Sequence, residues 1–91
     1  MKEHRWTVKL FIDEGVDDGT KTVTYAQLDN RDGVQLTGRG VAQRSPHDND
    51  VPEIGDELSA SRALHDVADQ LLQASADDVS QATHEQVDLK H

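Results

Sequence analysis

The amino-acid sequence predicts an α+β domain: a three-stranded antiparallel meander sheet with a long C-terminal helix packed on one face. Two observations lead to this prediction. Residues 5–42 contain three stretches in which apolar and polar side chains alternate, separated by short turns, and residues 52–83 repeat apolar side chains every three or four positions. With a polar linker at 43–51 and a tail at 84–91, the 91 residues are expected to form a single domain.

The first two strands are predicted from the alternation of side chains. Residues 5–13 place large apolar side chains at the even positions, and residues 14–19 follow as a turn rich in Asp and Gly. Residues 21–29 contain Thr, Val and Tyr, which favour strands. The Asp-Gly pair at 32–33 is a strong hairpin signal. Short turns of this kind join neighbouring antiparallel strands, so we expect a meander.

The third strand, expected at residues 34–42, carries Gly38 and Gly40 on the same face. Glycine weakens a strand, so two glycines on one side need a physical reason. We favour close approach of the helix backbone to the flat surface that the missing side chains leave. A bulge at the end of the strand is the alternative.

The helix is predicted to begin at Pro52, because proline is favoured in a first helical turn. An apolar row follows, and we expect it to dock over the two glycines of the third strand. Ser75 and Asp78 have the spacing of a capping box, which favours a break and a short second helix there over one continuous helix. The row consists of Ile54, Leu58, Ser61, Leu64, Ala68, Leu71, Leu72 and Ser75, and the charged residues expected opposite it are Arg62, Asp66 and Asp69.

The net charge of −9 is unevenly distributed along the chain. Residues 1–50 contain seven basic and nine acidic side chains, whereas residues 51–91 contain two and nine. An acidic surface repels phosphate backbones and anionic lipids and attracts basic partners. We therefore expect self-association or a protein partner, and we expect neither double-stranded nucleic acid nor a membrane as a partner.

No pattern in the sequence points to catalysis, a metal or a cofactor. Cysteine is absent, which excludes disulfides, thiolate nucleophiles and cysteine-ligated zinc. The acidic residues at 13–18 lack the ligand order of an EF-hand, and the polar loop at His47 has no identifiable nucleophile. We expect a cytoplasmic protein with no membrane span, no catalytic residues and no cofactor. An enzyme or a small-ligand carrier is the remaining alternative.

We expect the helix to cover the sheet face that bears Val8, Leu10, Ala26, Leu36, Gly38 and Gly40. The opposite face is expected to be an interface, because it is too apolar for a solvated surface. We therefore expect a non-catalytic interaction module. Its partner is either a second copy, which would give a homodimer, or another protein. The alternatives are single-stranded RNA stacked on the two aromatic side chains, and coverage by the C-terminal segment. The candidate interface residues are Lys9, Phe11, Val23, Tyr25, Arg39 and Val41.

Several segments resemble a family of small uncharacterised actinobacterial proteins, the domain of unknown function 1876 family. These segments are WTV at 6–8, LTGRGVA at 36–42, NDVPEIGDEL at 49–58 and RAL at 62–64. The resemblance extends over residues 6–89 and implies a fold like that of the double-stranded-RNA-binding domain (dsRBD-like). The family has no established activity, so the resemblance implies architecture only.

Two features depart from the RNA-binding members of that wider fold. Those members have a helix before the first strand. The start of their final helix is rich in lysine and binds phosphates. Here only a few residues precede the first strand, and the predicted helix start carries Glu53, Asp56 and Glu57. Carboxylates at that place repel a phosphate backbone, so binding of double-stranded RNA is not expected.

Overall fold

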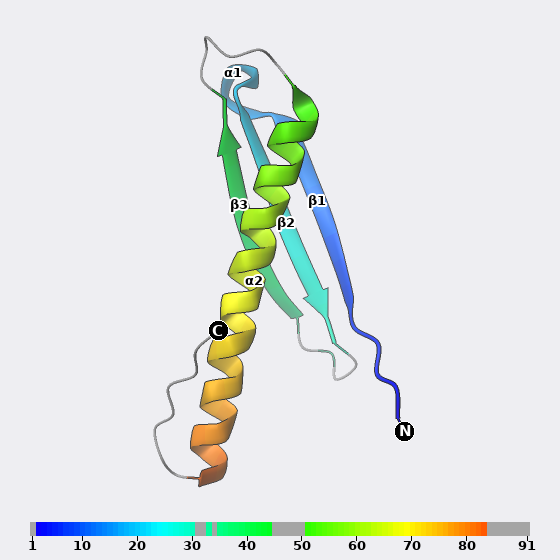
Figure 1. The fold of residues 1–91 in the computed structure, drawn as a ribbon, viewed down its shortest axis with the longest axis vertical. Coiled ribbons are helices and arrows are strands. Elements are labelled where there is room, and N and C mark those ends of the chain that lie inside the picture. The colour runs from blue at the N-terminus through cyan, green and yellow to red at the C-terminus, as the bar shows by residue number, and fades with distance from the viewer. Residues whose placement is uncertain (1, 31–32, 34, 45–50, 84–91) are drawn as a thin grey trace.

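The computed structural model describes residues 2–30, 33, 35–44 and 51–83. The chain forms β1 (Thr7–Gly15), α1 (Val16–Gly19), β2 (Lys21–Asp29), β3 (Gln35–Gln43) and α2 (Pro52–Thr83), in that order. The strands form one sheet with α2 across one face (Figure 1). The predicted α+β architecture is confirmed. Most of the predicted linker and all of the predicted tail lie outside the described residues.

The three strands pair antiparallel in the order β1-β2-β3, as the meander requires. β2 and β3 pair without interruption, with Gly38 opposite Ala26 and Gly40 opposite Thr24. The alternative of a bulge at the glycines is therefore wrong. At the β2–β3 turn, Gly33 has φ 78° and its N–H donates to the Asn30 carbonyl at 3.2 Å, as expected of a glycine in a tight turn.

The connection between β1 and β2 is a single tight turn, α1. Asp17 and Asp18 have φ of 53° and 61°, in the left-handed region that aspartate tolerates better than most residues. Thr20 closes the turn through its hydroxyl, which donates to the Asp17 carbonyl at 2.9 Å. The Asp17 carboxylate also lies 3.0 Å from the ammonium group of Lys21. Asp17 therefore stabilises this turn through its carbonyl oxygen and pairs with the adjoining Lys21 through its carboxylate.

Gly38 and Gly40 lie directly under α2, as predicted. A Cβ atom at Gly38 would overlap the Ala63 carbonyl oxygen, and one at Gly40 would overlap the Ser59 carbonyl oxygen. Contact between the helix backbone and the strand is possible only without side chains at these two positions. The close approach inferred from the paired glycines is confirmed.

The helix face that docks on the sheet differs from most of the predicted row, although Leu71 of that row packs against the core. Ser59, Ala63 and Val67 are buried against the sheet, whereas Ile54 is 61% exposed and Leu58 is 41% exposed. The physical reason is the short distance between α2 and β3, which small side chains accommodate and a leucine row does not. The two buried hydroxyls at this contact satisfy each other, with 2.6 Å between Thr24 Oγ1 and Ser59 Oγ.

The predicted break at Ser75 is also wrong, because α2 continues to Thr83. Ser75 is an exposed position within the helix, and its neighbours Ala74 and Ala76 are strong helix formers. The helix is further supported by a hydrogen bond of 2.9 Å from Gln73 Nε2 to Asp77 Oδ1, four residues on. The serine and aspartate therefore lie inside the helix and cap nothing.

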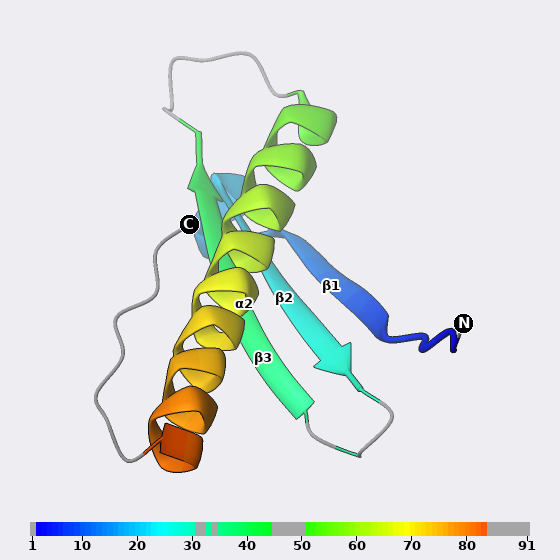
Figure 2. The same cartoon turned by 60° about the horizontal axis from the view of Figure 1, so that its bottom comes forward.

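The hydrophobic core lies between α2 and the strands β2 and β3. Its buried residues are Ala26, Leu28, Ala63 and Val67, with Leu36 and Leu71 packed against them. Figure 2 shows α2 running over β3 and β2 while β1 lies to the side. All nine residues of β1 are exposed, so this strand contributes little to the core.

Candidate interaction surface

The outer edge of β3 is closed by side chains of α2. Arg62 Nη1 donates to the Val41 carbonyl at 2.6 Å, and Gln70 Nε2 donates to the Thr37 carbonyl at 2.8 Å. Between them, Asp66 Oδ2 accepts the N–H of Arg39 at 2.9 Å. Helix residues four apart thus pair with strand residues two apart. Arg62 and Asp66 were expected opposite the docking row, and they lie instead beside the strand edge, where Arg62 remains exposed and Asp66 is half-buried.

The outer edge of β1 has no such cover. Among the described residues β1 pairs with β2 alone, so its other side carries backbone groups that no described strand pairs with. Between Thr7 and Asp13, no side chain of another described element is hydrogen bonded to this strand. The sheet therefore has one closed edge and one open edge.

β1 exposes large apolar side chains on both of its faces. Trp6, next to the start of the strand, and Phe11 are each 52% exposed, and Leu10 is 41% exposed. Val8 and Leu10 were expected to be covered by the helix, and this part of the prediction is wrong. α2 docks on the glycines of β3 and crosses β2, and it approaches β1 at only a few residues, so most of β1 stays uncovered. The exposed apolar side chains are Trp6, Val8, Leu10, Phe11 and Ile12, called here the β1 patch.

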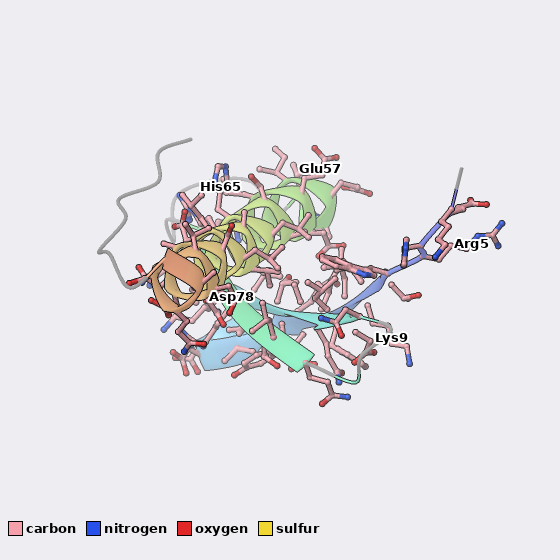
Figure 3. All side chains as sticks on the ribbon, turned by 90° about the horizontal axis from the view of Figure 1, so that it is seen from below. Arg5, Lys9, Glu57, His65 and Asp78 are labelled. Carbon is pink, nitrogen blue, oxygen red and sulfur yellow. The ribbon has the colours of Figure 1, made fainter. Side chains whose placement is uncertain are left out.

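The six predicted interface residues share the sheet face opposite α2. Phe11, Tyr25 and Arg39 form one row across the three strands, and Val23 lies beside Val41 in the next row. Their exposure is unequal: Phe11 and Tyr25 are 52% and 40% exposed, whereas Val23 is buried at 6%. Lys9 is exposed as well, on the same face of β1, and Figure 3 places it with Arg5 on the β1 side of the molecule.

A hollow of about 270 Å³ lies where the start of α2 meets the ends of β2 and β3. Thr22, Arg44, Ile54 and Leu58 are among the residues that line it. His65 is not among them, and His47 lies outside the described residues. No described histidine therefore lines this hollow.

In the part of the chain that the structure describes, no group of three or more His, Cys, Asp or Glu side chains is arranged to hold a metal ion. Among the same residues no helix is long and apolar enough to cross a membrane. The described surface features are thus the open β1 edge, the sheet face opposite α2, and the solvent side of α2.

Comparison with known proteins places the chain among uncharacterised mycobacterial relatives. A family model described as Rv2632c-like matches residues 4–88. The uncharacterised protein Mb1767 of Mycobacterium bovis is 44% identical over 80 residues, 88% of this chain and 81% of that protein. The uncharacterised protein Rv2632c of Mycobacterium tuberculosis is 42% identical over 59 residues, 65% of this chain and 63% of that protein.

A crystal structure of Rv2632c superposes on this chain with a TM-score of 0.81 and 33% sequence identity. The match covers 93% of this chain and 96% of that structure. The architecture of sheet and helix is therefore shared with a solved relative. None of these relatives carries a described activity, so the function must be argued from the surface itself.

Proposed function

The chain belongs to the Rv2632c-like family, and from its surface we propose that it is a non-catalytic interaction module that self-associates through β1. Two copies would pair their β1 strands antiparallel and form one six-stranded sheet. The finer assignment to a dsRBD-like fold and the cytoplasmic location stay predictions. What supports the proposal is the combination of an open sheet edge and the β1 patch.

The observation that most supports the proposal is that four large apolar side chains of the nine-residue edge strand, and Trp6 just before it, are exposed. Proteins usually shorten, charge or cover such edges, because an open strand is a template for another strand. α2 covers the opposite edge of the sheet in this way and leaves β1 open. Burial of apolar area contributes roughly 25 cal/mol per Å², so covering the β1 patch would stabilise a complex.

The charges along β1 favour a second copy as the partner. Arg5 and Lys9 lie in the first half of this segment, and Asp13 and Glu14 lie near its end. An antiparallel copy places the basic half of each strand beside the acidic half of the other. This local complementarity offsets the repulsion expected between two molecules of net charge −9.

The sheet face that contains Phe11, Tyr25 and Arg39 also has the side chains of a base-stacking surface. Its row of two aromatics and one cation is short, and the chain as a whole is strongly acidic. Phosphate backbones are repelled by such a charge. Protein contact is therefore the proposed use, and nucleic-acid binding stays a prediction.

Sedimentation of the full chain tests the proposal. We expect a species of about 20 kDa, because one chain is 10.1 kDa. Leu10→Lys should give a monomer, since it places an ammonium group within the β1 patch. Leu58→Lys is the matched control: Leu58 is also 41% exposed but lies on α2, so this variant should stay dimeric.

A second measurement uses the absence of cysteine in the chain. Leu10→Cys should form a covalent dimer on mild oxidation, and Leu58→Cys should not. Circular dichroism of each variant establishes that the fold is retained. A wild-type chain that sediments as a monomer at high concentration, or a Leu10→Lys variant that remains a dimer, would rule the proposal out.

A further inference from the structure

The solvent side of α2 carries a second row, four of whose six side chains are apolar and which lies outside the core cluster and β1. Its members are spaced alternately by four and three residues, which is the spacing of core positions in a coiled coil. At about 100° per residue they lie opposite Ser59, Ala63 and Val67, the residues that contact the sheet. The members are Ile54, Leu58, Ser61, His65, Ala68 and Leu72, called here the outer row.

Most of the outer row faces away from the sheet, and Ile54 and Leu58 at its start also border the hollow beside the ends of β2 and β3. Ile54 is 61% exposed, Leu58 is 41% exposed, and Leu72 is half-buried. Figure 3 shows His65 and Glu57 on the side of α2 away from the strands. Ser61 and Ala68 carry small, exposed side chains between the larger ones. A second helix could therefore pack its side chains into this row.

The charge beside the outer row selects the kind of partner. α2 contains seven acidic residues and one basic residue, Arg62, whose guanidinium is already hydrogen bonded to β3. Glu57 and Asp69 lie about 60° to either side of the row. A second copy of α2 would bring the same negative charge against these groups. A helix with Lys or Arg beside its apolar residues would instead be attracted.

We propose that the outer row is a docking site for a basic amphipathic helix of a partner protein. The proposal is independent of self-association, because β1 and the solvent side of α2 are separate surfaces. The four apolar members, Ile54, Leu58, Ala68 and Leu72, supply the contact, and the flanking carboxylates supply the preference for a basic partner.

The test uses the full chain and a fluorescein-labelled peptide of 18 leucine and lysine residues arranged to form an amphipathic helix. Two control peptides are needed. One has the same composition in an order that gives no apolar face, and the other replaces each lysine with glutamate. Fluorescence anisotropy should show saturable binding of the first peptide at least tenfold tighter than that of either control.

Two variants locate the binding site. Leu58→Lys and Ser61→Lys should each weaken binding of the amphipathic peptide at least tenfold, because they place a like charge in the outer row. Ser61 is already exposed and polar, so its substitution leaves the core undisturbed. Leu10→Lys is the control and should bind the peptide as the wild type does, although it disrupts the proposed dimer.

Several outcomes would overturn this proposal. Equal binding of the amphipathic and reordered peptides would mean general charge attraction. The same conclusion would follow if neither substitution in the outer row affected binding. Absence of binding would mean that the row does not accept a basic helix. If Leu58→Lys and Ser61→Lys converted a dimer into monomers, a second copy would be the occupant. If only the Leu10→Lys variant lost the dimer, self-association through β1 would be supported, and a second copy would not be the occupant of the outer row.

Discussion

Gly38 and Gly40 determine how closely α2 lies on the sheet. The carbonyl oxygens of Ala63 and Ser59 occupy the space that a side chain at these positions would need. Because the two backbones touch, the helix residues at the contact must be small. The buried hydrogen bond between Thr24 and Ser59 is a consequence of the same short distance.

Gly40→Ala should destabilise the fold by about 1–3 kcal/mol, the usual cost of an extra methyl group in a packed core. The new Cβ would meet the Ser59 carbonyl, so α2 must move away from β3. Urea denaturation followed by circular dichroism measures the change. Gln43→Ala, at an exposed position of the same strand, is the control and should change stability little. An unchanged unfolding midpoint in Gly40→Ala would contradict the close contact.

At the scale of elements, α2 has two structural tasks. Its small face covers the core, and its edge residues Arg62, Asp66 and Gln70 hydrogen bond to the free backbone of β3. One helix therefore buries the sheet and closes one of its edges. This arrangement depends on the helix lying directly over β3, which the glycines permit.

Asp66→Ala should leave the Arg39 N–H without its partner and cost about 0.5–1.5 kcal/mol. Asp66→Asn keeps a side-chain oxygen at the same place and should retain most of the stability. Thermal unfolding gives the loss, and hydrogen exchange at the Arg39 amide should quicken in the alanine variant alone. Equal exchange in both variants would show that the carboxylate does not protect this edge.

At the scale of the whole molecule, the two edges of the sheet differ in how far α2 covers them. The 32 residues of α2 extend about 48 Å, whereas nine-residue strands extend about 30 Å. The helix therefore continues past the end of the sheet, as Figure 1 shows, in a molecule of 53 × 28 × 21 Å. Most of this cover lies over β2 and β3. β1 is left with an open edge and a charge pattern that can match its own antiparallel copy.

Exchanging the charges of β1 tests that match. Lys9→Glu should weaken the dimer, because both halves of the strand would then be acidic. Lys9→Glu combined with Asp13→Lys restores opposite charges with the polarity reversed, so dimerisation should recover. Sedimentation at low and moderate salt measures both effects, and salt should weaken the charge contribution. If the double variant dimerised no better than Lys9→Glu, charge pairing would not guide the association.

Part of the candidate site could be predicted from the sequence. Alternation of side chains placed Phe11, Tyr25 and Arg39 on the sheet face opposite the helix, and the structure has them in one row. The exposure of Leu10 on the other face could not be predicted this way. Alternation identifies the face on which a side chain lies, but it carries no information on how far a helix reaches across neighbouring strands.

Local periodicity, turn residues and missing side chains are enough to specify the three strands, their meander order, the start of α2 and its contact with the paired glycines. Which side of α2 docks and which sheet edge stays open follow only from packing in three dimensions. Helical periodicity favoured a row of mostly large side chains, whereas Ser59, Ala63 and Val67 are the residues buried against the sheet. Only the row of small residues fits the short distance to β3, and this leaves the larger row on the surface.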